Sequence, residues 1–113
     1  MRAINRNSGK ELAWNLSVAE TFFSRILGLL GRRALSRGEG LLIRPCKGVH
    51  TFLMQFPIDV VFLDKQNRVM ETIMNLQPHR LTKVLLVSTS VIELPAGTVQ
   101  ASATVIGDII VID

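Results

Sequence analysis

The spacing of hydrophobic and polar residues predicts a chain built mostly from short strands. From Gly38 onward, short apolar runs alternate with turn-forming residues, a pattern typical of strands. Before it, an Asn7-Ser8-Gly9 turn between two further runs predicts a hairpin, because asparagine and glycine tolerate the positive φ of a tight turn. The predicted strands are 2–6, 11–16, 41–44, 49–56, 58–63, 69–76, 85–94 and 109–112, with a turn at 64–68 and a loop at 77–84.

One amphipathic helix is predicted between the hairpin and the later strands. Ser17 and Glu20 have the spacing of a capping box, and Gly31 suits a left-handed helix stop. We therefore expect a helix from Ser17 to about Leu30, with one apolar stripe packed on the sheet. The stripe consists of Phe22, Phe23, Ile26, Leu27, Leu29 and Leu30.

The strand-rich pattern predicts a mostly β fold, α+β by content, in the form of a sandwich or small barrel. A length of 113 residues fits one domain spanning 1–113 with a single substantial core. No apolar run reaches the roughly 18 residues of a membrane span, and the first residues lack the apolar centre of a secretion signal. We expect a cytoplasmic protein with no membrane partner.

The cysteine content restricts the disulfide and metal sites that the chain can form. Cys46 is the only cysteine, so the chain cannot form an internal disulfide or a thiolate zinc site by itself. Lys47 beside it could lower the thiol pKa, although an inert thiol in a turn is the simpler interpretation. We expect neither a metal nor a cofactor.

The chain is basic, with a formal charge of +4 and a pI near 10, which permits anionic partners. Arginines cluster in and after the predicted helix, but no aromatic residues are interleaved for base stacking. A solvated basic face is the expected role of this cluster, and nucleic-acid binding rests on net charge alone. The cluster is Arg25, Arg32, Arg33, Arg37 and Arg44.

Three polar residues lie within apolar runs. His50 shares a face of the predicted strand 49–56 with Phe52 and Met54, whereas Asp59 and Glu93 interrupt runs that should be buried. A buried carboxylate must be paired, hydrogen-bonded or protonated. Either Arg25 and Arg32 pair with these carboxylates and fix the docking of the helix, or the carboxylates line a pocket with His50.

Known catalytic signatures are missing from the chain: it has no G-x-S-x-G, P-loop, G-x-G-x-x-G after a strand, or H-E-x-x-H. Gly28-Leu-Leu-Gly31 closes the predicted helix instead of opening one, so we do not expect it to bind phosphate.

An ordered set of segments resembles the uncharacterised DUF192 family over about Leu16 to Val111. The segments are Ser24–Arg32, Gly40–Ile43, His50–Asp59, Phe62–Asp64, Val91–Gly97 and Gly107-Asp108. The resemblance implies a small, mostly β domain of jelly-roll-like architecture and no established activity. The positions that match family motifs are Arg25, Gly28, Arg32, Met54, Pro57, Asp59, Glu93, Gly97, Gly107 and Asp108.

The chain departs from the family pattern at two places. Ser24 stands where a glutamate often precedes the arginine, and Phe52-Leu53-Met54 replaces a Phe-Trp-Met run followed by lysine. If that tryptophan stacks on a ligand in relatives, this chain binds something different.

Three functions are compatible with these residues. The first is a binding or accessory module that holds a small polar ligand or a peptide; the second is a hydrolase that uses Asp59 or Glu93 with His50; the third is a weak nucleic-acid binder. The oligomeric state stays open. The candidate pocket residues are His50, Thr51, Gln55, Asp59, Glu93, Arg25 and Arg32.

Overall fold

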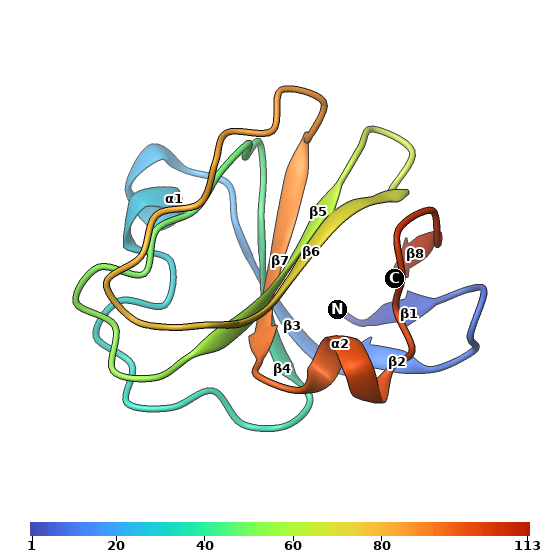
Figure 1. The fold of residues 1–113 in the computed structure, drawn as a ribbon, viewed down its shortest axis with the longest axis horizontal. Coiled ribbons are helices and arrows are strands. Elements are labelled where there is room, and N and C mark those ends of the chain that lie inside the picture. Colours follow the sequence, from blue (N-terminus) through green and yellow to red (C-terminus); the bar gives the residue numbers. More distant parts are fainter.

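The computed structural model describes residues 1–113 as two β-sheets, two short helices and long connecting segments (Figure 1). The larger sheet has five strands in the order β3-β4-β7-β5-β6, and the smaller has three in the order β2-β1-β8. The elements are β1 (Ala3–Asn5), β2 (Glu11–Ala13), β3 (Asn15–Ala19), α1 (Phe22–Leu27), β4 (Glu39–Ile43), β5 (Ile58–Leu63), β6 (Val69–Leu76), β7 (Ser90–Pro95), α2 (Thr98–Ala101) and β8 (Ile110–Ile112).

The five-stranded sheet separates two hydrophobic cores. Along β5, Val60 and Phe62 face one core while Val61 and Leu63 face the other, as strand alternation requires. One core lies between this sheet, the three-stranded sheet and α2. The other lies beneath α1 and the segments 44–57 and 77–89, which cover the opposite side of the sheet in Figure 1. The sheet is therefore buried on both faces.

The predicted helix is shorter and begins later than expected. Ser17 lies in β3 and pairs with Leu41 of β4. The residues expected to form the first helical turn therefore belong to a strand. Thr21 caps α1 instead: its side chain accepts the Ser24 N–H at 3.1 Å, and the Ser24 hydroxyl accepts the Thr21 N–H at 3.0 Å. The Ser17–Glu20 capping box was therefore the wrong prediction.

The apolar stripe of this helix is mostly exposed, contrary to the expectation that it is core. Phe22 and Phe23 are 64% and 75% exposed, and Ile26 and Leu27 are also exposed. Only Leu29, which follows the helix, is fully buried in the core below it. The helix has only six residues, fewer than two turns, so its closely spaced apolar side chains point in several directions and cannot all face the sheet.

Two predicted strands are also different in the structure. Residues 49–56 form an irregular segment with one isolated bridge between His50 and Leu81. The strand predicted at 85–94 corresponds to β7, which begins at Ser90 instead of Leu85. The N-terminal hairpin and the strands at 58–63 and 69–76 are confirmed.

The mostly β prediction is confirmed, with two sheets and no closed barrel. Neither helix has the length and apolarity needed to cross a lipid bilayer.

Candidate functional site

Glu93 is the most unusual ionisable residue of the fold. It lies in the middle of β7 and pairs with Leu41 of β4 and Val60 of β5, so its side chain projects toward the core beneath α1. The residue is 2% exposed, and its carboxylate accepts no hydrogen bond from the protein. Burial raises the pKa of Glu93 to about 7, because desolvation disfavours the charged form.

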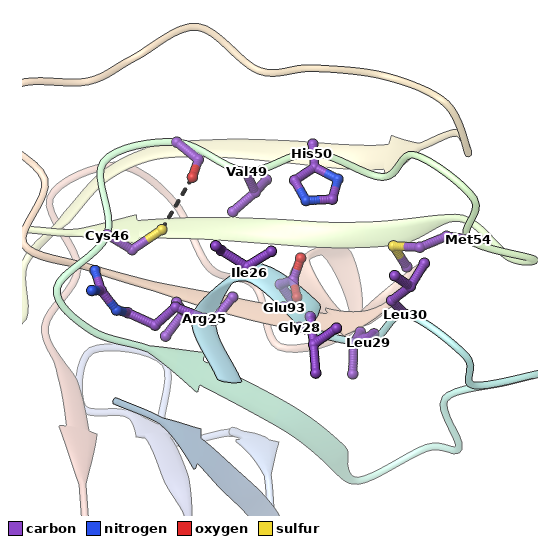
Figure 2. Close-up of a pocket in the computed structure, with 13 residues that line it drawn as sticks. Arg25, Ile26, Gly28, Leu29, Leu30, Cys46, Val49, His50, Met54 and Glu93 are labelled. Atoms are coloured by element: carbon purple, nitrogen blue, oxygen red, sulfur yellow. Dashed lines mark hydrogen bonds between the residues drawn. The ribbon is translucent and has the colours of Figure 1, made fainter. Parts of the chain in front are cut away.

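A cavity of about 50 Å³ adjoins this carboxylate. Its walls come from α1 and the residues that follow it, from the segment 46–54, and from β4 and β7. Figure 2 shows Glu93 below His50 and Val49, with the backbone of Gly28 beside it and Met54 at one end. Such a volume holds a few small polar atoms or water molecules.

Three buried side-chain atoms of the protein lack a hydrogen-bond partner: Arg25 Nε, His50 Nδ1 and Glu93 Oε1. All three residues line this one cavity. Buried polar atoms are almost always paired, because an unpaired one costs about 1 to 3 kcal/mol. The presence of all three residues around one cavity therefore indicates a place prepared for a polar group that is not part of the chain.

Gly28 forms one wall of the cavity because any larger residue would crowd the carboxylate. A Cβ atom at this position would lie 3.3 Å from Glu93 Oε1, and the backbone adopts φ +48°. The glycine was interpreted from sequence as part of the helix end, and only the fold reveals its contact with β7.

Cys46 lies in the same wall with its thiol satisfied. Its Sγ donates to the carbonyl of Gly48 at 3.1 Å, the contact drawn in Figure 2. Burial raises the pKa of the Cys46 thiol, with a smaller contribution from Glu93. A neutral thiol is a poor nucleophile, which agrees with the inert role predicted from sequence.

An open groove of about 470 Å³ adjoins the cavity on its outer side. Arg25, Ile26, Cys46 and His50 line both spaces, so the groove and the inner cavity share a wall. The remaining groove wall is mostly apolar and includes Phe22 of α1.

Asp59 does not belong to this site. It faces the core on the other side of the sheet, where Oδ1 accepts the Asn75 N–H at 2.9 Å and Oδ2 accepts the N–H groups of Gly97 at 3.1 Å and Val99 at 2.9 Å. These bonds satisfy the buried carboxylate and anchor the start of α2. A hydrolase site that combines Asp59 with His50 is therefore wrong.

The predicted arginine–carboxylate pairs do not form. Arg32 binds Glu39 at 3.0 Å on the surface, and Arg25 donates from Nη1 to the carbonyl of Pro45 at 3.0 Å. Neither arginine pairs with Asp59 or Glu93. The structural explanation offered for the buried carboxylates, that they dock the helix through arginine, is wrong for both.

The other two candidate residues are also outside the cavity. Thr51 is fully buried, and its hydroxyl donates to the Gln77 carbonyl at 2.6 Å and accepts the Arg80 N–H at 2.9 Å. It holds residues 77–80 against the segment 49–56. Gln55 is exposed and does not line the cavity. Of the seven predicted residues, the structure brings together Arg25, His50 and Glu93.

A second groove of about 590 Å³ lies at the opposite end of the molecule, between β2, the residues before β4, and α2. Trp14 lies in its wall, with the guanidinium of Arg37 5.9 Å from the ring centroid. A Cβ on Gly38 would overlap the indole, so this glycine is required by the ring. None of the unpartnered buried atoms lies there, and the groove carries no comparable signal for a polar ligand.

Comparison with known proteins places the chain among sequences without an assigned activity. The family model DUF192, described as "Uncharacterized ACR", matches residues 3–112. A UPF0127 protein of Pyrococcus horikoshii is 32% identical over 90% of this chain and 92% of its own length. A UPF0127 protein of Pyrococcus furiosus is 28% identical over 93% of this chain and 92% of its own length.

Two crystal structures share the fold. A protein of unknown function from Novosphingobium aromaticivorans superposes with a TM-score of 0.86 at 20% identity, covering 99% of this chain and 84% of that one. A candidate transcription regulator from Sinorhizobium meliloti gives 0.79 at 22% identity, covering 97% and 89%. At these identities the likeness shows the fold alone.

Proposed function

We propose that this chain, which belongs to the uncharacterised DUF192 family, is a binding module that holds a small polar ligand in the cavity between Glu93, His50 and Arg25. The proposal rests on one observation: the three residues that carry an unpartnered buried side-chain atom all line this space. A ligand that pairs with them would recover the free energy lost on burying them.

The polar residues of the cavity are not needed to build the core. Replacing a buried unpaired carboxylate by an apolar residue of similar size is generally stabilising, because it removes a desolvation penalty. An ionisable side chain such as Glu93, which lowers the stability of the fold and lines a cavity, is typical of a functional site.

The available donors and acceptors suit a small ligand that can both donate and accept hydrogen bonds. Arg25 Nε can only donate, the neutral His50 ring can do either, and Glu93 donates when protonated and accepts when ionised. The inner volume is too small for a folded partner or a peptide backbone.

Small probes test this proposal directly. We expect acetate and acetamide, titrated separately, to shift the amide resonances of Gly28, Gly48 and His50 in ¹H–¹⁵N spectra of at least one titration. The indole resonance of Trp14, in the distant groove, serves as an internal reference. Shifts confined to the Trp14 region, or none at all, would contradict a polar site at Glu93.

Substitutions separate the cavity from the rest of the surface. Glu93→Leu and His50→Phe remove the polar groups and retain side-chain volume, so both should abolish the cavity shifts. Glu71→Gln is the matched control, because Glu71 pairs with Lys83 on the surface away from the cavity.

A second candidate function is general acid–base catalysis by Glu93 together with His50, and a hydrolase is the reaction class that we favour. It is supported by the pKa of Glu93, which lies near neutral pH as an efficient acid or base requires. Both residues line the same cavity. A screen of ester and amide substrates should then yield turnover that Glu93→Gln eliminates and Glu71→Gln does not affect.

The proposal also includes two expectations from the sequence. The single unpaired cysteine supports a cytoplasmic location, since disulfides are rare in that compartment. The two stacked sheets support a jelly-roll-like path for the strands.

A further inference from the structure

The mouth of the cavity is bordered by exposed apolar side chains. Phe22 and Ile26 of α1 line the outer groove, and Phe52 stacks on His50 with ring centroids 5.6 Å apart. Leu81 pairs with His50 through the isolated bridge. Each of these four apolar side chains is more than 45% exposed. Polar side chains are the usual choice at exposed positions, so a cluster of exposed apolar ones marks a surface with a function.

The charges around the same space are mainly positive. Arg25 lines both the cavity and the groove, and Lys47 lies in the groove wall. Glu93 is the only acidic residue that lines either space, and its burial favours the neutral form. The site therefore presents a permanent positive charge and an apolar surface, with no fixed negative charge to balance them.

We infer that the cavity and the groove together bind an apolar monocarboxylate, with its carboxylate in the cavity beside Arg25 and Glu93 and its apolar body in the groove against Phe22 and Ile26. This inference rests on the proposed binding function and names its ligand class. A protonated Glu93 would donate to the carboxylate, and such charge-assisted hydrogen bonds are about twice as strong as neutral ones. The guanidinium of Arg25, which extends toward Cys46 in Figure 2, would supply the positive charge of the site.

Binding of this ligand must be coupled to a proton. Two carboxyl groups in hydrogen-bond contact cannot both be ionised in a dry cavity, so the pair shares one proton. The other ionisable groups facing Glu93 are Arg25 of α1 and Cys46 and His50 of the segment 46–54. Above about pH 7, where free Glu93 is ionised, each bound carboxylate therefore takes up close to one proton.

Isothermal titration with octanoate below its micelle concentration tests the inference, with octan-1-ol as the neutral probe of equal chain length. We expect octanoate to bind at least about tenfold more tightly than octan-1-ol and than acetate. Its affinity should be about tenfold lower at pH 8 than at pH 6, and titrations in buffers of different ionisation enthalpy should show proton uptake at pH 8.

Variants identify the groups responsible. Arg25→Gln should weaken octanoate binding about tenfold or more, whereas Arg33→Gln, an exposed arginine outside both spaces, should leave it unchanged. Glu93→Gln keeps a hydrogen-bond donor and should abolish proton uptake while retaining binding. Phe22→Ser should weaken octanoate but not acetate.

The outcomes distinguish this inference from the proposed function. If octan-1-ol binds as tightly as octanoate, or if octanoate binds no better than acetate, the monocarboxylate inference is wrong while the polar cavity stands. If neither acetate, acetamide nor octanoate shifts the cavity resonances, both are wrong. Octanoate binding that Arg25→Gln and Glu93→Leu leave unchanged would also overturn the inference.

Discussion

Asp59 and Glu93 lie on adjacent strands of the five-stranded sheet but project from its opposite faces. Glu93 pairs with Val60 and Asp59 pairs with Leu94, so the two carboxylates are one residue out of step in the register. Their environments are opposite as well. Asp59 accepts three backbone hydrogen bonds, whereas Glu93 accepts none. This difference indicates that Asp59 stabilises the fold, whereas Glu93 is the carboxylate available to bind a ligand.

Asp59→Asn should destabilise the fold. An asparagine side chain has one acceptor oxygen and one NH₂ donor in place of two acceptor oxygens. Its NH₂ group would therefore face N–H donors that now bind the second carboxylate oxygen. We expect a loss of about 2 to 3 kcal/mol in the free energy of unfolding, measured by urea denaturation at pH 7. A loss below about 0.5 kcal/mol would show that these hydrogen bonds are not structural.

The pH dependence of stability should carry the signature of Glu93. Its pKa of about 7 in the folded protein is raised above the value of 4.5 for an unburied group, so the folded state binds more protons than the unfolded state between these values. Stability is then fully retained below about pH 4.5 and falls as the pH rises toward 7, by about 3 kcal/mol in total.

Glu93→Gln should remove this contribution, because glutamine does not titrate. Urea unfolding at pH 5 and pH 8 should show a smaller decrease for Glu93→Gln than for the wild type, and equal or greater stability at pH 8. Glu71→Gln, at a half-buried residue that pairs with the exposed Lys83, should retain the wild-type decrease. Equal pH dependence in wild type and Glu93→Gln would contradict the raised pKa.

Gly28→Ala should destabilise the protein by more than Gly31→Ala. Both glycines have positive φ, +48° and +86°, so alanine is strained at either position by about 1 to 2 kcal/mol. At Gly31 the new Cβ meets open space, but at Gly28 it lies 3.3 Å from Glu93 Oε1. The difference between the two variants in thermal or urea unfolding measures the contact with the carboxylate, and identical losses would show that this contact is unimportant.

Apolar residues of and near α1 should differ sharply in their contribution to stability. Phe23→Ser should change the free energy of unfolding by no more than about 0.5 kcal/mol, because Phe23 is 75% exposed. Leu29→Ala should cost about 2 to 4 kcal/mol, because Leu29 is buried in the core beneath the helix. A large loss for Phe23→Ser would restore the original expectation that the whole stripe is core.

Local patterns of the sequence were sufficient for the mostly β fold and for several of its elements. Strand alternation and turn residues correctly predicted the N-terminal hairpin and the strands around Asp64–Arg68, because these features depend on neighbours close in the chain. The same patterns identified Asp59 and Glu93 as buried carboxylates, since each interrupts an apolar run.

Tertiary structure decided the partners of those residues. Whether Ser17 begins a helix or joins a strand depends on Leu41, which lies far along the chain, and the parallel ladder of β3 and β4 prevails over the local capping signal. The contacts of Asp59, Glu93 and Gly28 likewise come from distant segments. The sequence by itself determined that Asp59 and Glu93 are buried, because each interrupts an apolar run, but it did not determine burial everywhere, since Phe22 and Phe23 of the expected core stripe are exposed. Only the fold decided which apolar side chains are covered and which buried polar groups are left without a partner, because both depend on contacts between remote parts of the chain.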